Sequence, residues 1–241
     1  MENYVAVSEF TRQSIVEHLR IPPERVHTIY HAINTAHFRP FPNARAYVAE
    51  QYNLSFKQGE IYLLYVGNEL PRKNLKTLLH GIALLRETGY AVQLIKVGGA
   101  SGQRWREQFL MDIGQHRLED IVTIVQEFVP DSDLPAFYSA ADLLVHPSLI
   151  EGFGFPVLEA MACGLPVVCS DAGALTEITG NNALHFDGRN VDSLVASVQR
   201  GIDDSALRED LRQRGLLRSQ QFSPALFTSK LLDVYQKAAA Q

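Results

Sequence analysis

Short runs of apolar residues alternate along the chain with segments in which apolar residues recur at every third or fourth position. The runs are typical of buried β-strands, and the spaced positions are typical of amphipathic helices. The clearest helical spacing is that of Leu75, Leu78, Leu79, Ile82 and Leu85. The predicted strands are Ile61–Val66, Val92–Val97, Ile121–Val125, Leu143–His146, Val167–Ser170 and Ala183–Phe186. This alternation predicts an α/β fold, a parallel sheet with helices on both faces.

The two ends of the chain do not continue this series. Near the N-terminus, Tyr4–Ser8 and Val26–Tyr30 have the composition of strands, and Glu9–Leu19 between them has that of a helix. Pro40 then marks a linker. At the other end, the apolar spacing of Phe222–Ala240 predicts an amphipathic helix.

Composition excludes several classes of protein. The 241 residues are 46% hydrophobic and 20% charged, which is typical of a globular domain. The net charge of −5 disfavours nucleic acid as a partner. No apolar run approaches the roughly 20 residues of a membrane span, and Met1–Asn3 does not have the basic and apolar character that opens a signal peptide. Cys163 and Cys169 are predicted to be buried and reduced, and the strand-like surroundings of His27 and His31 disfavour a zinc site.

The stretch Glu151–Glu159 carries two carboxylates around a glycine-containing loop that runs into a predicted helix. Pro156 suits the first helical position, and Gly152 and Gly154 allow the backbone to approach a ligand closely. The free N–H groups at a helix start favour an anion, and we expect Glu159 in the first turn of this helix. The motif therefore predicts a ligand that carries both phosphate and hydroxyl groups.

A second candidate site is the basic pair Arg72 and Lys73, which follows a predicted strand and is expected to open the next helix. Two cations at this position can neutralise the two phosphates of a nucleotide diphosphate. Loops that follow parallel strands meet at one edge of the sheet. The other loops expected at that edge contain Gly67, Gly98, Phe128-Val129 and residues 148–154.

Five stretches of the sequence resemble motifs of a known family. They are Gly67–Asn74, Pro147–Ser148, Glu151–Ala162, Gly164–Val168 and Gly173–Ile178. In residues, order and spacing they resemble the retaining, metal-independent glycosyltransferases of family 4. Members of that family have two Rossmann-like domains that face each other across a cleft, an architecture called GT-B. The resemblance covers nearly the whole chain, but only the C-terminal, donor-binding half of a typical member.

The resemblance implies a role for each motif. Arg72 and Lys73 hold the diphosphate of a nucleotide sugar, Glu159 holds the ribose hydroxyls, and Glu151 faces the transferred sugar. Arg72, Lys73 and Glu151 form the implied catalytic group, and no metal ion is required. The other implied donor-binding residues are Gly67, Gly98, Phe128, Val129, Ser148, Gly152, Phe153, Gly154 and Phe155. The segment Glu127–Val129, which contains two of these residues, surrounds the base mainly through its backbone. Residues 153–155 offer backbone N–H groups, while the two phenylalanine side chains pack. Ser148 lines the pocket or caps a turn.

The implied activity is transfer of a hexose from UDP-hexose or GDP-hexose to a glycan or lipid-linked acceptor, with retention and without a cofactor. Residues 1–40 would then be the end of an N-terminal acceptor domain with its linker, 41–220 the Rossmann-like nucleotide-sugar-binding domain, and 221–241 a crossover helix. The rest of the N-terminal domain is expected in cis or in trans, and the isolated chain is expected to be poorly active. The expected location is the cytoplasm, with peripheral attachment to the inner face of the membrane as an option.

Three other functions are possible for such a fold. One of them, a phosphorylase of similar architecture, is disfavoured because the sequence has no recognisable motif for a pyridoxal-binding lysine. A non-catalytic nucleotide-sugar-binding module, or one subunit of a split transferase, requires the same donor-binding residues and stays open. A nicotinamide-dependent oxidoreductase is disfavoured, because Gly98–Gly102 lacks the third element of the dinucleotide fingerprint and follows the second strand of the domain, not the first. The Pro71–Asn74 segment is similar to that of bacterial polysaccharide mannosyl- and glucosyltransferases.

Overall fold

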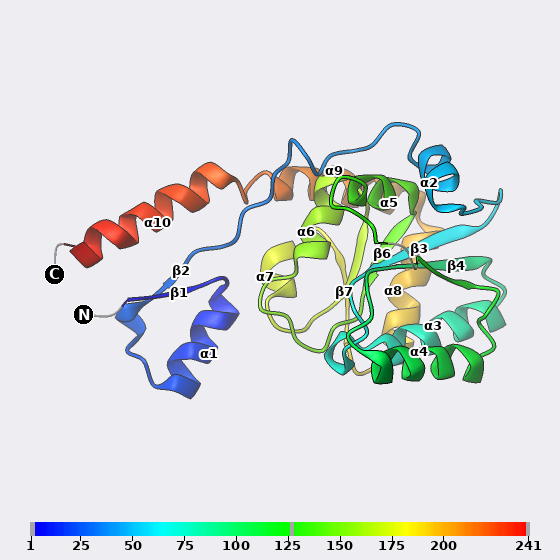
Figure 1. Cartoon of the computed structure of the whole chain (residues 1–241), viewed down its shortest axis with the longest axis horizontal. Coiled ribbons are helices and arrows are strands. Elements are labelled where there is room, and N and C mark those ends of the chain that lie inside the picture. The colour runs from blue at the N-terminus through cyan, green and yellow to red at the C-terminus, as the bar shows by residue number, and fades with distance from the viewer. Residues whose placement is uncertain (1–2, 126–127, 240–241) are drawn as a thin grey trace.

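The centre of the protein is a six-stranded parallel sheet with the strand order β5-β4-β3-β6-β7-β8 (Figure 1). The computed structural model describes residues 3–125 and 128–239. The strands are β3 (Ile61–Val66), β4 (Val92–Val97), β5 (Val122–Ile124), β6 (Leu143–His146), β7 (Val167–Ser170) and β8 (Leu184–Phe186). The predicted α/β fold is confirmed. β5 is one residue shorter at each end than predicted, although Ile121 and Val125 still hydrogen-bond to β4, and β8 begins one residue later. Strand limits commonly differ by one residue in this way.

Helices cover both faces of this sheet, so its strands are buried on both sides. On β3 the side chains alternate: Tyr62, Leu64 and Val66 pack on one face, and Leu63 and Tyr65 on the other. The first face is covered by α2 (Ala44–Tyr52), α5 (Leu134–Ala140) and α6 (Phe155–Ala162). The second is covered by α3 (Leu75–Glu87), α4 (Gln103–Gln115) and α8 (Val191–Asp203). The helices α7 (Leu175–Thr179) and α9 (Ser205–Ser219) complete the domain.

The N-terminal segment forms a separate two-stranded parallel sheet of β1 (Tyr4–Ala6) and β2 (Val26–Thr28), connected by α1 (Glu9–Leu19) and a short 3₁₀-helix, Pro23–Arg25. Both strands end two residues before the predicted limits. For β1 the reason is Ser8, whose side chain accepts a hydrogen bond from the N–H of Thr11 and so caps α1.

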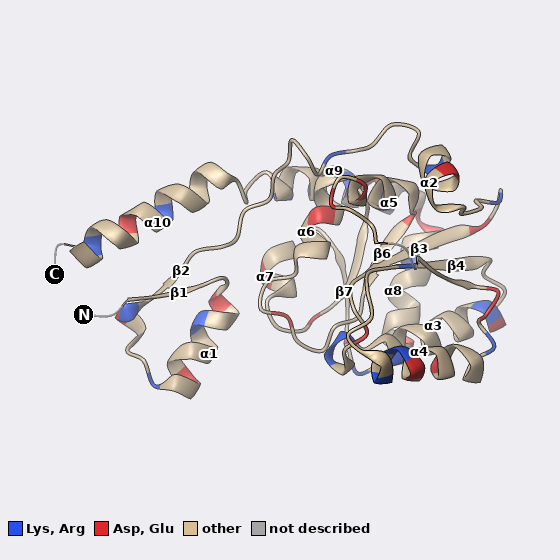
Figure 2. Cartoon of the chain, viewed as in Figure 1, with Lys and Arg blue, Asp and Glu red and all other residues tan. Residues whose placement is uncertain are grey.

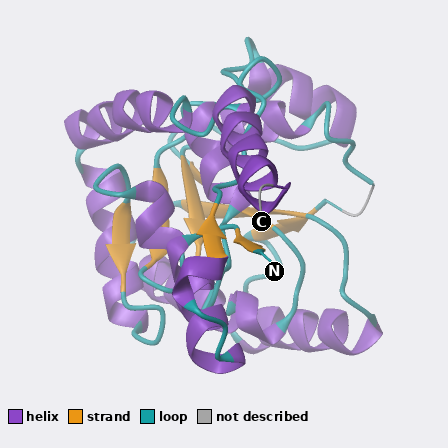
Figure 3. Ribbon diagram, turned by 90° about the vertical axis from the view of Figure 1, so that its left-hand side faces the viewer, coloured by secondary structure: helices purple, strands orange, loops and turns teal. Residues whose placement is uncertain are grey.

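The C-terminal helix α10 (Pro224–Ala239) leaves the main domain and ends beside the N-terminal segment, so that the two chain ends lie near each other (Figures 1 and 3). It begins two residues later than predicted, because Ser223 accepts a hydrogen bond from the N–H of Leu226; Ala240 lies outside the described residues. The apolar residues Ile33, Phe153 and Phe222 form a cluster that joins the segment after β2, the α6 loop and the start of α10.

Acidic and basic residues are interspersed along the outer helices, while the strands of the central sheet contain few charged residues (Figure 2). Mixed signs of this kind are consistent with the small net charge of −5. In the described part of the chain, no helix is long and apolar enough to cross a membrane.

Candidate functional site

The carboxyl ends of β3 and β4 approach each other closely at one edge of the sheet. Gly67 donates its N–H to the carbonyl oxygen of Val97 at 2.9 Å. At Gly98 the backbone has a φ of 115°, and a Cβ there would lie only 2.7 Å from the carbonyl oxygen of Gly67. Any larger residue would push the two loops apart, so glycine is required at this close approach.

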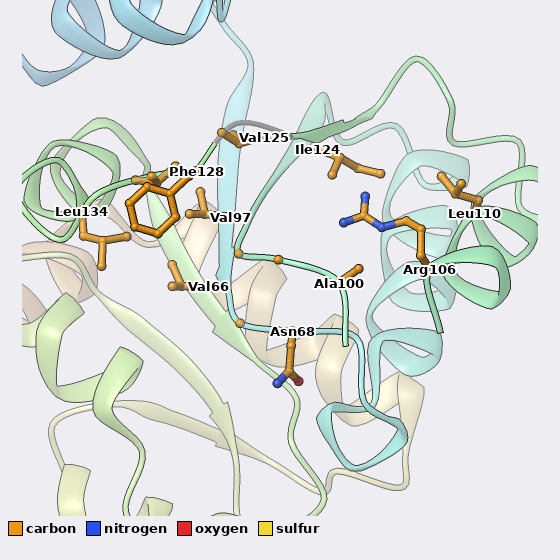
Figure 4. A pocket seen from close by; sticks show the side chains of 14 residues that line it. Val66, Asn68, Val97, Ala100, Arg106, Leu110, Ile124, Val125, Phe128 and Leu134 are labelled. Carbon is orange, nitrogen blue, oxygen red and sulfur yellow. The ribbon is translucent and has the colours of Figure 1, made fainter. Parts of the chain in front are cut away.

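A cavity of about 850 Å³ opens at this edge (Figure 4). It is lined by Gly67, Gly98, Phe128 and Val129, four residues that the sequence placed here. Its walls are mainly apolar, with Val66, Val97, Ile124, Val125, Leu110 and Leu134. The Phe128 side chain is 87% exposed beside the opening. Glu127, the third member of the predicted base-binding segment, lies outside the described residues.

Arg72 and Lys73 lie in a 3₁₀-helix, Pro71–Lys73, and not at the start of α3 as predicted. The reason is Asn74, which adopts a left-handed conformation with φ of 57° and separates this short helix from α3. The Asn74 amide group donates hydrogen bonds to the carbonyl oxygens of Pro147, at 3.1 Å, and Gly188, at 2.7 Å. The basic turn is thereby tied to the loops that follow β6 and β8.

Glu151 is the centre of a buried polar group that contains three other predicted residues. Its Oε1 lies 2.5 Å from Nζ of Lys73 and accepts a hydrogen bond from Oγ of Ser148 at 2.8 Å. Its Oε2 lies 3.4 Å from Nη1 of Arg72. Only 9% of Glu151 and 8% of Lys73 is exposed. Ser148 therefore contributes a side-chain contact to this group, and the basic turn and the Glu151 loop form one site.

Sequence reasoning missed His146 as a member of this group. Its Nε2 lies 3.2 Å from Oε1 of Glu151, and its ring stacks on Tyr65. Burial lowers the pKa of His146, although Glu151 opposes that shift. Burial by itself raises the pKa of Glu151, but hydrogen bonds from His146 and Lys73 outweigh it and hold that pKa well below its ordinary value. The sequence feature that could have indicated His146 is its position as the one polar residue at the end of the apolar strand Leu143–His146.

The loop after Glu151 leads into α6 with a left-handed Gly154, φ 104°. A Cβ on this glycine would lie 2.7 Å from Cδ2 of Leu175, so glycine is required here. The Phe153 side chain is buried, as predicted, whereas Phe155 is partly exposed and its ring contacts that of His31. The carbonyl oxygen of Gly152 accepts hydrogen bonds from Ser8, at 2.7 Å, and from Thr11. The loop thus contacts the N-terminal segment directly.

Glu159 lies in the second turn of α6, not in the first as predicted, because the helix already begins at Phe155 and Pro156 takes its second position. Its Oε2 accepts a hydrogen bond from the Tyr138 hydroxyl at 2.6 Å. Burial raises the pKa of Glu159, and the Tyr138 hydrogen bond opposes this shift. Glu151 and Glu159 therefore have different partners: cations for the first, a neutral hydroxyl for the second.

A second buried ion group, also missed from sequence, lies beside the cavity. Glu69 contacts Nζ of Lys96 at 2.8 Å and Nη2 of Arg106 at 2.9 Å. The side chains of Glu69 and Lys96 are completely buried. Burial lowers the pKa of Lys96, while the ion pair with Glu69 counteracts this. The available signal was a lysine within the apolar strand Val92–Val97, since a buried charge requires a partner.

The described residues contain no cluster of three or more histidine, cysteine, aspartate or glutamate side chains arranged to hold a metal ion. The two cysteines, Cys163 and Cys169, are free thiols and are buried, as predicted. The polar groups at the sheet edge include the cations of two ion groups, Arg72 with Lys73 and Lys96 with Arg106, together with carboxylates and backbone amides. Such a set is suited to binding a phosphorylated, hydroxyl-bearing ligand.

The sheet, its helices and the loops at its carboxyl edge define a Rossmann-like domain of the GT-B type. A model of the family "Glycosyl transferases group 1" matches residues 49–218, and the chain belongs to this family.

Individual relatives agree with this assignment. The chain is 36% identical to O-antigen chain mannosyltransferase B of Escherichia coli, over 96% of this chain and 60% of that protein. It is 29% identical to D-inositol 3-phosphate glycosyltransferase of Salinispora arenicola, over 99% of this chain and 55% of that protein. The chain therefore spans less than two thirds of the length of these relatives.

Solved structures give the same fold. Sucrose-phosphate synthase from Thermosynechococcus elongatus matches with a TM-score of 0.85 and 27% identity, over 98% of this chain and 58% of that one. Anabaena Alr3699/HepE in complex with UDP and glucose matches with a TM-score of 0.85 and 20% identity, over 100% of this chain and 64% of that one. At that identity the second match shows the fold alone.

Proposed function

We propose that the chain is the donor-binding part of a retaining glycosyltransferase that transfers a hexose from a nucleoside diphosphate sugar to a glycan or lipid-linked acceptor. The observation that carries the proposal is the buried contact between Lys73 and Glu151, with Arg72 beside it, at the same edge of the sheet as the apolar cavity. Cations beside an apolar cavity suit a ligand that combines phosphates with a base.

Each part of the donor has a matching group. The diphosphate binds Arg72 and Lys73, and the backbone N–H groups of residues 153–155 assist. The ribose hydroxyls donate to Glu159, whose carboxylate retains acceptor capacity beside Tyr138. The base occupies the cavity by Gly67, Gly98 and the backbone of residues 128–129. The hexose lies against Glu151 and its partner Ser148.

In the proposed reaction, the bond between the anomeric carbon and the diphosphate breaks and the acceptor hydroxyl attacks from the same face of the sugar. Negative charge develops on the departing diphosphate, and Arg72 and Lys73 stabilise it there. A phosphate oxygen of the donor takes the acceptor proton, so the protein supplies no general base. The two cations and the backbone amides perform the neutralisation for which other enzymes use a metal ion.

The 36% identical E. coli relative is described as an O-antigen mannosyltransferase. By analogy with it, we infer that the transferred hexose is mannose and that the product is a bacterial polysaccharide. We place the reaction in the cytoplasm, at or near the inner face of the membrane, where a lipid-linked acceptor would be available.

We further propose that residues 1–40 end an acceptor-binding domain, that 41–220 form the nucleotide-sugar-binding domain, and that 221–241 cross back to the acceptor domain. That domain would be supplied in cis or in trans. The cluster of Ile33, Phe153 and Phe222 supports this arrangement, because it connects all three parts. Transfer requires an acceptor held against the donor across the cleft.

The test measures binding and transfer separately. Calorimetry on the full chain should show saturable binding of at least one nucleoside diphosphate. If neither UDP nor GDP binds, the proposal is contradicted. A transfer assay with a labelled nucleoside diphosphate hexose should then show little product from the chain alone and much more with the N-terminal half of a relative added. Binding without transfer under both conditions would favour a non-catalytic binding module, and full activity of the chain alone would contradict the need for a further domain.

A further inference from the structure

Arg106, on α4, projects toward one end of the cavity, near Leu110 and Ile124, while Phe128 and Leu134 lie on the opposite side (Figure 4). Its guanidinium binds Glu69 through one edge only. Nε lies 3.2 Å from Oε2 of Glu69, and Nη2 lies 2.9 Å from Oε1. This is the two-point contact that a planar guanidinium makes with a carboxylate.

Glu69 is itself immobilised, so Arg106 is held in a fixed orientation. Nζ of Lys96 contacts Oε1 of Glu69 at 2.8 Å and also donates to the carbonyl oxygen of Gly98 at 2.5 Å. Glu69 and Lys96 have fully buried side chains. A side chain that is already ordered loses less conformational entropy when it binds a ligand.

The other edge of the guanidinium, formed by Nη1 and the second N–H of Nη2, has no partner in the part of the chain that the structure describes. Among the described residues, residues 3–125 and 128–239, Glu69 is the one partner of the Arg106 guanidinium. This free edge presents two parallel N–H donors, and it lies in a cavity with mainly apolar walls. Such walls suit the flat face of a base, and the paired donors require two adjacent acceptors on the edge of that base.

We propose that Arg106 determines the base specificity of the donor site by binding the O6 and N7 acceptors of a guanine, so that the donor is a guanosine diphosphate sugar. Arginine pairs with this edge in a two-point contact. Uracil has two carbonyl acceptors, O2 and O4, but the N3–H donor lies between them, so they do not form an adjacent pair. Adenine presents an amino group where guanine has O6. The inference rests on the proposed function, because it assigns the cavity to the base of the donor.

The phosphates of the donor are a less suitable partner for this edge. They have Arg72 and Lys73 at the basic turn, and the apolar residues Val97, Ile124 and Leu110 would leave a phosphate poorly solvated near Arg106. The base and phosphate alternatives make opposite predictions for ligands that share a diphosphate but differ in their base.

The experiment is calorimetry of the full chain with four nucleoside diphosphates. GDP and IDP, which share O6 and N7, should bind with similar affinity and more tightly than UDP and ADP. A two-point contact corresponds to a preference of roughly 5- to 150-fold. 7-Deaza-GDP, which lacks the N7 acceptor, should bind more weakly than GDP.

Two variants assign the preference to this side chain. Arg106→Met leaves the Glu69–Lys96 pair intact, and it should remove most of the preference for GDP over UDP and make 7-deaza-GDP equal to GDP. Arg106→Lys keeps the charge but not the paired donors, and it should also lose the preference. Arg104→Met, an exposed arginine on the same helix that lies over Trp105, is the matched control and should behave as the wild type.

A wild-type protein that binds UDP or ADP as tightly as GDP would overturn the inference. So would a preference for GDP that survives in Arg106→Met, or an Arg106→Met variant that weakens all four ligands equally, which is the result expected of a phosphate contact. In each of these cases the proposed function stands, since nucleotides still bind. Absence of binding of all four ligands to the wild type would instead contradict the proposed function, and this assignment with it.

Discussion

Lys73 and Glu151 form a buried ion pair of 2.5 Å that joins the turn after β3 to the loop after β6. Glu151 is thereby the counter-ion of a cation that we assign to the donor diphosphate. A diphosphate that approaches Lys73 must share this cation with Glu151 or displace it. Substitutions of the charged residues at this site should therefore affect the binding of different parts of the donor.

The Arg72→Ala variant should bind nucleoside diphosphates more weakly by about 1.5–3 kcal/mol, the usual contribution of a charge-assisted hydrogen bond. Arg72 is the better choice for this test, because its side chain is 44% exposed and its loss leaves the Lys73–Glu151 pair in place. Binding of the corresponding nucleoside, which has no phosphate, should not change. Calorimetry with both ligands measures the difference, and Lys76→Ala, an exposed cation on α3, is the control. Equal weakening of the nucleoside would argue against a phosphate contact.

Glu151→Gln should separate the bare nucleotide from the sugar nucleotide. The amide removes the negative charge that competes for Lys73, so binding of the nucleoside diphosphate should be unchanged or tighter. Binding of the nucleoside diphosphate hexose should be weaker, because the carboxylate that we assign to the sugar is gone. Parallel titrations of both ligands provide the measurement. A loss of affinity for the bare nucleotide as large as that for the sugar nucleotide would show that Glu151 does not act on the sugar.

Glu159 should make stability depend on pH. Its pKa is raised by burial above the ordinary value of 4.5. A carboxyl group with a raised pKa contributes its stabilisation below the unfolded-state pKa, and loses it as the pH rises through the folded-state value. In Glu159→Gln, which stays neutral, this loss is absent, so the free energy of unfolding of the variant should increase relative to the wild type as the pH rises from about 4.5. Urea unfolding between pH 4 and 8 tests this, and a constant difference across that range would contradict it.

Glu177 should hold the N-terminal segment against the main domain. Its Oε1 accepts hydrogen bonds from the N–H of Glu9, at 2.6 Å, and from the Tyr30 hydroxyl, while Oε2 accepts one from the N–H of Phe10. Glu177→Ala removes this contact to the first turn of α1 and should cost about 1–2 kcal/mol. Hydrogen exchange should become faster at the start of α1 and in β2, but not in the central sheet. Glu209→Ala, an exposed carboxylate on α9, is the control, and unchanged exchange in α1 would show that Glu177 does not dock the segment.

Most of the architecture could be predicted from sequence because it follows from local pattern. Continuous apolar runs such as Ile61–Val66 coincide with the observed strands, since a strand in a parallel sheet is buried on both faces. The helix from Leu75 was predicted equally well by its apolar spacing. The errors lie at boundaries. Asn74 delays the start of α3, and Phe155 begins α6 early enough to move Glu159 into its second turn, because single-residue backbone conformations set helix limits.

For the candidate site, too, the local motifs were predictable from sequence, but the contacts between them were not. Residues close together in the chain, such as Arg72 with Lys73 and Glu151 with Glu159, form motifs from which the sequence alone predicts a chemistry. Which partner each charge receives was decided by the tertiary structure alone. Lys73 pairs with Glu151, 78 positions away, and Ser8 reaches the carbonyl oxygen of Gly152, 144 positions away. Glu69, Lys96 and Arg106 come from three different elements and meet only because β3 and β4 end side by side. Hydrophobic periodicity is a property of neighbouring residues, whereas the pairing of buried charges is a property of the folded sheet edge, and no local pattern encodes it.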